Sequence, residues 1–159
     1  MTNAGSAGSI SAAVDATLTA SRALLGVVAR SVSSALEHVT PPQFRVLVIL
    51  STDGPLRTST LAARMDAVPS TFTRSLDKME AGGWITRREN PDSRREVLVD
   101  LTDEGRRLVR DATDRRREEI RSVVTQLSPA ERADVVRGLT LFSSAAGEPP
   151  VDELLVPGL

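Results

Sequence analysis

Apolar residues recur at helical spacing through most of the chain and alternate at strand spacing over one short stretch. Near the N-terminus, the apolar positions 10, 14, 18, 25, 28, 32 and 36 lie mostly three, four or seven residues apart, which predicts an amphipathic helix over residues 9–38. One helix cannot bury such a stripe by itself, so we expect it to pack against other helices or a second subunit. Residues 1–8 are small and polar, and we expect them to be disordered.

A second helix is predicted directly after the first by a start signal and a stop signal. Thr40 stands at the N-cap, Pro41 at the first helical position and Gln43 three residues after the cap, which together form a capping box. The sequence that follows, FRVLVILS, is apolar on nearly every side, so we expect it to form the central helix of the core. The breaker DGP at residues 53–55 ends this helix.

Two more helices follow at close spacing. A short one over residues 57–65 starts at Arg57 or Thr58, and the next starts near Pro69 and runs over residues 69–81. The glycine pair at 82–83 ends the second of them as a glycine C-cap does. The apolar positions of this helix lie at i, i+4 and i+7 and therefore on one face: Phe72, Leu76 and Met79.

Residues 84–101 have the pattern of a β-hairpin. Two β-like runs, residues 84–87 and 96–101, flank the turn-forming sequence NPDS. In the second run Val97, Val99 and Leu101 alternate with polar neighbours, so we expect these side chains to tie the hairpin to the core. We also expect Trp84, the only tryptophan, to anchor the hairpin in the core.

Two helices and a tail complete the chain. Thr102 caps a helix that runs to about residue 127, with Asp103 and Glu104 in its first turn complementing the helix dipole. A second capping box, from Ser128 to Glu131, opens a last helix to about residue 142, with Val135, Leu139 and Phe142 on one face. The fold class that this order predicts is mainly α with a small β-hairpin. Its parts are a winged helix–turn–helix over 39–101, flanking dimerisation helices over 9–38 and 102–145, and an acidic, proline-containing tail over 146–159.

The composition narrows the chemistry. Cysteine is absent and His38 is the only histidine, which excludes disulfides and thiolate sites and leaves too few ligands for a conventional zinc site. The chain has no P-loop, dinucleotide-binding glycine motif or metal-binding histidine pair, so we expect no enzymatic activity, no metal and no cofactor. The longest uninterrupted apolar run, Val46–Leu50, is far too short to span a bilayer, and the N-terminus lacks signal-peptide features. We expect a cytoplasmic protein with no membrane partner.

The charge of the chain is unevenly distributed. The formal net charge is −1 and the pI is about 5.9, which gives no overall argument for nucleic-acid binding. Between Arg57 and Arg95, however, eight basic residues stand against five acidic ones. From Gly147 onward, the tail has three acidic residues and no base. The excess of positive charge therefore coincides with the predicted winged helix–turn–helix.

The helix over residues 69–81 has the pattern of a DNA-recognition helix. A helix that enters a major groove buries one side and leaves the other polar. With its apolar face in the core, this helix turns hydroxyls and basic groups outward, which suit phosphates and base edges. The same groups would fit a solvated surface helix, but the basic hairpin directly downstream favours DNA binding. The outward residues are Ser70, Thr71, Thr73, Arg74, Asp77 and Lys78.

The segment LAARMDAVPSTFTRSLDKMEAGGWITRRENPDSRREVLVDLTDEGRRL resembles the MarR family of bacterial transcription regulators. The family's recognition helix ends in a leucine- or methionine-glutamate pair before glycine, matched here by Met79-Glu80 and the glycines at 82–83. Its wing signature, D-x-R-x-x-x-V-x-L-T-x-x-G, places the arginine on Arg95 and the last glycine on Gly105. Ser93 stands where the family has an aspartate that holds the wing arginine, which leaves open a looser wing or one held by Asp92.

The resemblance implies a homodimer that binds double-stranded DNA. The terminal helices would interleave with those of a partner, and two recognition helices would enter successive major grooves of a pseudo-palindromic operator. The wing tips would reach the adjacent minor grooves. The expected DNA contacts come from the recognition helix (Ser70, Thr71, Thr73, Arg74 and Lys78), the wing (Arg87, Arg88, Arg94 and Arg95) and the preceding helix (Arg57, Thr58 and Ser59).

The resemblance also implies release from DNA by a small aromatic or lipophilic effector. His38 and Phe44, near the junction of the first two helices, are the candidate effector-binding residues. The alternative places Phe44 in the core and His38 at an exposed helix end. We expect a repressor, although the position of the operator relative to the promoter decides between repressor and activator.

A second function class keeps the same fold but has no DNA affinity. The net charge of −1 and the acidic tail are compatible with a winged-helix dimer that acts as a protein-interaction module. Such a protein would form a stable dimer, retain no DNA and copurify with another protein. A DNA affinity that falls steeply with salt would instead identify the regulator.

Overall fold

The structure is a computed structural model that describes residues 4–90 and 93–147, with side chains over 9–90 and 96–147. The elements in chain order are α1 (Ala4–Val32), the 3-10 helix η1 (Ala35–Glu37), α2 (Pro41–Asp53), β1 (Leu56–Arg57), α3 (Thr58–Arg64), α4 (Pro69–Ala81), β2 (Ile85–Asn90), β3 (Ser93–Leu101), α5 (Asp103–Val124) and α6 (Pro129–Ala146). The predictions made for Asp92 and for the tail from residue 148 onward fall outside the described residues.

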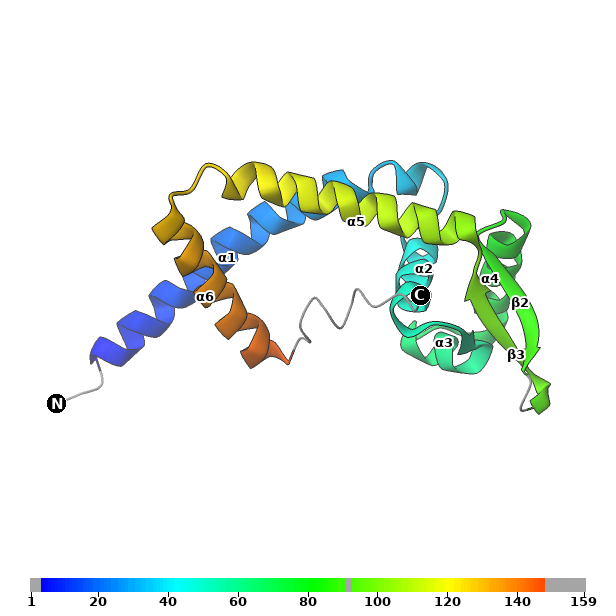
Figure 1. Cartoon of the computed structure of the whole chain (residues 1–159). Coiled ribbons are helices and arrows are strands. Elements are labelled where there is room, and N and C mark those ends of the chain that lie inside the picture. The colour runs from blue at the N-terminus through cyan, green and yellow to red at the C-terminus, as the bar shows by residue number, and fades with distance from the viewer. Residues whose placement is uncertain (1–3, 91–92, 148–159) are drawn as a thin grey trace.

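The winged part of the molecule lies at one end of the long helix α5 (Figure 1). There α2, α3 and α4 gather around a small antiparallel sheet, while α1 runs alongside α5 towards the opposite end. The last helix, α6, leaves from that opposite end of α5. This arrangement confirms the predicted fold class, which is mainly α with a small β-hairpin.

Local capping signals fix the starts of α2 and α6 as predicted. The Thr40 hydroxyl accepts a hydrogen bond from the Gln43 backbone N–H, and the Gln43 side chain accepts one from the Thr40 N–H at 2.9 Å. Ser128 and Glu131 form the same reciprocal pair at α6. Hydrogen bonds from the Ser128 hydroxyl and N–H lower the pKa of the Glu131 carboxyl.

Helix α1 differs from its prediction at both ends. It begins at Ala4, within the segment 1–8 for which the sequence predicts disorder. At the other end the α-helix stops at Val32 instead of residue 38. The Ser33 hydroxyl donates to the Arg30 carbonyl at 2.8 Å, and serines that bond to the local backbone in this way weaken a helix. The chain continues through the 3-10 turn η1 to Glu37.

The sheet contains one strand more than predicted. Its order is β1-β3-β2, with Leu56 paired with Val99 and Ile85 paired with Leu101. Strand β1 is only two residues long and follows the helix breaker, so no alternating pattern marks it in the sequence. The two hairpin strands are also longer than predicted, and Asn90 and Ser93 are paired residues of the ladder and not part of a free turn.

The core lies between the helices of the winged part and the sheet. Leu47 and Leu50 of α2 are fully buried, as expected for the central helix. From the hairpin, Val99 and Leu101 reach this core, but Val97 is 42% exposed, so its predicted core role is wrong. Val97 lies two residues closer to the hairpin tip than Val99, and therefore further from the core. The buried cluster consists of Ala35, Val39, Phe44, Val46, Leu47, Leu50, Leu61, Ala62, Phe72, Leu76, Met79, Ile85, Val99, Leu101, Val109 and Ala112, with Trp84 among the partly buried residues packed against it.

One close junction joins the end of α4, the start of the hairpin and the start of α5. The Thr102 hydroxyl donates to the Gly83 carbonyl at 2.6 Å and accepts from the Gly105 N–H at 3.1 Å. The Thr102 N–H donates to the Trp84 carbonyl at 3.2 Å. A Cβ atom on Gly105 would lie well inside 3.0 Å of the Trp84 carbonyl oxygen, closer than real Cβ atoms approach. Glycine at position 105 is therefore required by the packing of two backbones.

We predict that Gly105→Ala destabilises the protein by about 3 kcal/mol, because the added methyl group overpacks a site formed by backbone on both sides. Thermal unfolding followed by circular dichroism measures the effect. Asp111→Ala, at an exposed position of the same helix, is the control and should change stability by less than about 0.5 kcal/mol. Equal stability of the two variants would contradict the junction described above.

Candidate nucleic-acid interface

Helix α4 has one buried and one exposed face, as predicted. Phe72, Leu76 and Met79 are at most 5% exposed. At its C-terminus the Trp84 N–H bonds to the Met79 carbonyl and the Gly83 N–H to the Glu80 carbonyl, both at 2.9 Å, and Gly83 has φ 77°. This Schellman arrangement leads the chain directly from α4 into β2. The exposed residues of α4 include Ser70, Thr71, Thr73, Arg74, Asp77 and Lys78.

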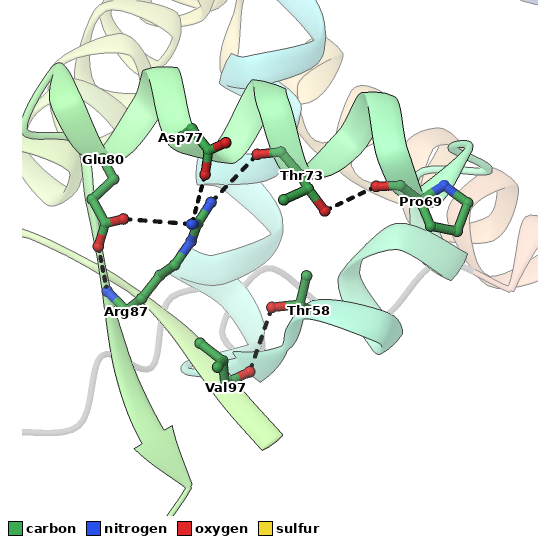
Figure 2. A network of polar contacts seen from close by, with 7 residues as sticks. All are labelled: Thr58, Pro69, Thr73, Asp77, Glu80, Arg87 and Val97. Carbon is green, nitrogen blue, oxygen red and sulfur yellow. Dashed lines mark hydrogen bonds and ion pairs between the residues drawn. The ribbon is translucent and has the colours of Figure 1, made fainter. Parts of the chain in front are cut away.

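The predicted recognition residues of α4 differ in how they are already engaged. The Thr73 hydroxyl donates to the Pro69 carbonyl at 2.9 Å, so in this arrangement it offers DNA its acceptor lone pairs (Figure 2). Arg74 and Lys78 form no ion pair with any residue that the structure describes. Their positive charges are therefore available to a phosphate or a base edge.

Arg87 of β2 points back onto α4 and not into solvent (Figure 2). Its Nη1 lies 2.7 Å from Asp77 Oδ1 and 3.6 Å from Glu80 Oε2, and its Nη2 donates to the Thr73 carbonyl at 3.4 Å. Its backbone N–H donates to Glu80 Oε1 at 3.1 Å. The predicted wing contact Arg87 is thus engaged within the protein and fastens the hairpin to the recognition helix.

Arg88, the next residue on β2, is more exposed and faces a different partner. Its Nη2 lies 3.8 Å from Asp100 Oδ2, and Arg106 of α5 bonds to the other oxygen of that carboxylate at 2.9 Å. Half of the Arg88 side chain is exposed. The long ion-pair distance and the exposure leave Arg88 able to reach a phosphate, and its DNA contact stays a prediction.

Glu96 connects all three strands and has no counterpart among the predicted site residues. Its Oε2 lies 3.0 Å from Arg57 Nε on β1 and accepts from Asn90 Nδ2 on β2, also at 3.0 Å. The Thr58 hydroxyl bonds to the carbonyl of the next residue, Val97, at 3.5 Å (Figure 2). An acidic residue directly after two arginines was the only sequence signal for this role. The predicted contacts Arg57, Thr58 and Ser59 line an open hollow beside Glu96 and Val97.

The remaining wing arginines lie on β3. The backbone of Ser93, Arg94 and Arg95 belongs to this strand, whereas their side chains fall outside the described part of the chain. The predicted DNA contacts of Arg94 and Arg95, and the consequence of Ser93 at the family's aspartate position, therefore stay predictions. The Glu96 contacts provide a separate link between the strands.

Neither His38 nor Phe44 lines the two open hollows of the winged part described here. Phe44 is 9% exposed and belongs to the core, and His38 is exposed at the end of η1, where its ring lies 6.0 Å from that of Trp84. A second open groove, of about 410 Å³, lies between α2 and the α3–α4 turn, and neither residue lines it. These positions match the alternative of a core phenylalanine and a surface histidine, and Trp84 anchors the hairpin as predicted.

A helix–turn–helix followed by a hairpin, with long helices on both sides, defines a winged helix–turn–helix protein. The family model of the MarR family matches residues 39–97. The crystal structure of RV1404 from Mycobacterium tuberculosis has a TM-score of 0.80 and 45% identity, covering 87% of this chain and 95% of that one.

Two curated relatives come from Bacillus subtilis (strain 168). The uncharacterized HTH-type transcriptional regulator YfiV is 33% identical over 104 residues, 65% of each chain. The HTH-type transcriptional repressor MdtR is 42% identical over 69 residues, 43% of this chain and 44% of its own length. The matched segments thus span less than two thirds of either relative.

The chain belongs to the MarR family. The fold, the family match and the relatives' names agree with one another, so the predicted family is confirmed. The same membership supports the expectation that the protein is not an enzyme, because the family consists of transcription regulators.

We predict that Glu96→Ala loosens the wing. Loss of the shared carboxylate removes an ion pair to Arg57 on β1 and a hydrogen bond to Asn90 on β2. Because the Arg57 and Glu96 side chains are partly exposed, we expect the free energy of unfolding to fall by only about 1 kcal/mol. Backbone amides of β2 and β3 should exchange hydrogen faster than in the wild type. Glu118→Ala removes an exposed i, i+3 pair on α5 and is the control. Unchanged exchange in the hairpin would show that Glu96 does not hold it.

Proposed function

We propose that the protein is a dimeric, sequence-specific DNA-binding transcription regulator that binds a pseudo-palindromic operator. One observation carries this proposal: α4 buries one face and presents exposed hydroxyl and basic side chains on the other, directly beside a basic hairpin. A helix with these two faces suits insertion into a major groove, and the hairpin suits contact with the flanking backbone. The proposed contacts are Ser70, Thr71, Thr73, Arg74 and Lys78 of α4, Arg88, Arg94 and Arg95 of the wing, and Arg57, Thr58 and Ser59.

We further propose that the protein acts as a repressor in the cytoplasm. The relative MdtR is named a transcriptional repressor, which favours this sign of regulation. Release by a small aromatic or lipophilic effector belongs to the same proposal, with no site assigned, since Phe44 belongs to the core and His38 lies at the surface. A protein-interaction module without DNA affinity remains the competing function, and the binding experiment below separates the two.

Exposed apolar residues on the terminal helices support a homodimer. Along α1, Ile10, Leu18 and Leu25 are 59–66% exposed, and on α6 Leu141 and Phe142 are 67% and 55% exposed. Two helices from opposite ends of the chain thus leave large apolar side chains uncovered. Burial of such surface against a second copy would be favourable at about 25 cal/mol per Å².

Helix α1 also meets the length and composition of a membrane span. The segment Ser9–Val32 has 24 residues, and an 18-residue window within it has a mean hydropathy of 1.3. Small and polar residues interrupt its apolar positions, so it contains no long uninterrupted apolar run. We favour a dimer interface because Asp15 and Arg22 lie within this segment and because its C-terminal part packs against α5, where Val27 is 6% exposed. The core helix of a soluble protein can have the same length and apolar composition as a membrane span.

A binding series over increasing salt tests the DNA-binding function. Genomic fragments retained by the purified dimer are sequenced, and the affinity for an enriched fragment is measured between about 50 and 200 mM salt. A regulator with several phosphate contacts should lose affinity steeply over this range. A stable dimer that retains no fragment at low salt and copurifies with another protein would establish the interaction module instead.

We predict that Arg74→Ala weakens binding to the enriched fragment by about ten- to a hundredfold, since one arginine contact to a base contributes about 1–3 kcal/mol. Fluorescence anisotropy with the labelled fragment measures the loss. Arg110→Ala, at an exposed position of α5 and distant in sequence from the recognition helix, should bind as the wild type does. An unchanged affinity of the Arg74 variant would exclude Arg74 as a DNA contact.

We predict that Phe142→Asp dissociates the dimer, because a buried unpaired carboxylate is costly at an apolar interface. Sedimentation equilibrium measures the shift from dimer to monomer. Thr140→Asp adds the same charge about 200° away around α6 and serves as the control, which should leave the dimer intact. If Phe142→Asp also stays dimeric, the exposed face of α6 has another use.

A further inference from the structure

The DNA-facing surface of α4 carries two carboxylates beside its two basic residues. Asp77 and Glu80 are 56% and 40% exposed, on the same helix as Arg74 and Lys78. By themselves these four side chains give no net charge. A helix that approaches phosphates closely needs a positive surface, because uncompensated carboxylates there repel the DNA backbone.

Arg87 supplies the missing charge and is held in place along the helix. Its contacts are to the Thr73 carbonyl, the Asp77 carboxylate and the Glu80 carboxylate, which lie at i, i+4 and i+7 on one stripe of α4 (Figure 2). The backbone N–H of Arg87 adds a further bond to Glu80. One guanidinium therefore spans two turns of the recognition helix from the neighbouring strand.

Arg87 differs in exposure from Arg88, the other arginine of β2. The Arg87 side chain is 24% exposed, whereas that of Arg88 is 51% exposed. Successive residues of a strand point to opposite faces of a sheet, so Arg87 faces α4 while Arg88 faces Asp100 and α5. To reach a phosphate, Arg87 would have to leave both carboxylates unpaired at the surface that meets DNA.

We propose that Arg87 is a positioning residue for DNA recognition and not a phosphate ligand. It neutralises Asp77 and Glu80, so that α4 can enter the groove, and it fixes the wing against α4 through the Thr73 carbonyl and the Glu80 carboxylate. The inference rests on the proposed function, because it assigns a role within DNA binding. It also removes Arg87 from the predicted phosphate contacts of the wing.

A set of substitutions at three positions tests this role. The probe is a duplex enriched by the wild-type protein from a random-sequence library. The variants are Arg87→Gln, Arg87→Lys, the pair Asp77→Asn with Glu80→Gln, and the combination of that pair with Arg87→Gln. The amide side chains keep the carbonyl oxygens that accept from Arg87, so they remove charge with little change of shape. Arg88→Gln is the matched control on the same strand.

The expected result is a loss and a recovery of affinity. Arg87→Gln should weaken binding at least about tenfold, a coupling typical of contacting charged groups. Its salt dependence should match that of the wild type, because no phosphate contact is lost. Neutralisation of both carboxylates in the Arg87→Gln protein should restore the affinity to within about threefold of the wild type. Arg87→Lys, which retains the charge, should also bind nearly as the wild type does.

Two results would overturn the proposal. One is an Arg87→Gln protein that binds as tightly as the wild type. The other is an Arg87→Gln protein whose slope of log affinity against log salt concentration is smaller by about 0.9, as expected for one lost phosphate contact, and whose affinity does not recover when both carboxylates are neutralised. Arg88→Gln should show that second pattern. Failure of the wild type to enrich any duplex would instead contradict the proposed function itself and leave the variants unnecessary.

The folded state of each variant is checked by thermal unfolding and by molecular mass in solution. Recovery of affinity in the triple variant would show that Arg87→Gln had not simply misfolded, because a misfolded protein would not regain affinity on loss of two acidic charges. If the triple variant folds with wild-type stability and still binds weakly, the neutralising role of Arg87 is excluded.

Discussion

The close contact between the start of α5 and the end of α4 is the constraint on which the rest of the structure depends. Thr102 bonds to the Gly83 carbonyl and caps α5 at the same time, and Gly105 lets the helix backbone approach the Trp84 carbonyl. These contacts join the recognition helix, the hairpin and the long helix in one place. Since α5 leads towards the exposed apolar surfaces of α1 and α6, the same junction would set the placement of the recognition helix relative to a partner subunit.

Around this junction, charged side chains bind the wing to its neighbours on both faces. Arg87 holds the hairpin to α4, Asp100 links it to α5 through Arg106, and Glu96 connects the three strands. Individually, such partly exposed ion pairs contribute little stability. In the proposed function their value is geometric, because the relative position of α4 and the wing would decide which groove each of them reaches. The slightly acidic average charge of the chain has little bearing on this surface.

Much of the fold could be predicted because local signals agreed with the tertiary structure. Capping boxes at Thr40 and Ser128, the glycines after α4 and the apolar stripe of Phe72, Leu76 and Met79 all predicted elements that the structure confirms. The sequence does not predict strand β1, because a strand of two residues is too short to show an alternating pattern. It places the end of α1 too late, because the Ser33 hydroxyl bonds to the local backbone and so competes with the helix. At the site, the basic surface was predicted, but sequence position alone could not tell that Arg87 is held by Asp77 and Glu80 of α4 while Arg88 lies on the opposite face, half exposed beside Asp100. That distinction depends on which face of the sheet each side chain occupies and on contacts between residues that are distant in sequence.

A hydroxyl-radical footprint on a genomic fragment enriched by the wild-type protein tests the central claim most directly. A dimer with two winged domains should protect two segments on one face of the duplex, centred about one helical turn apart and related by two-fold symmetry. Flanking protection should mark the wings in the adjacent minor grooves. A single protected segment without symmetry, or no protection at a concentration at which the protein is dimeric, would contradict the account.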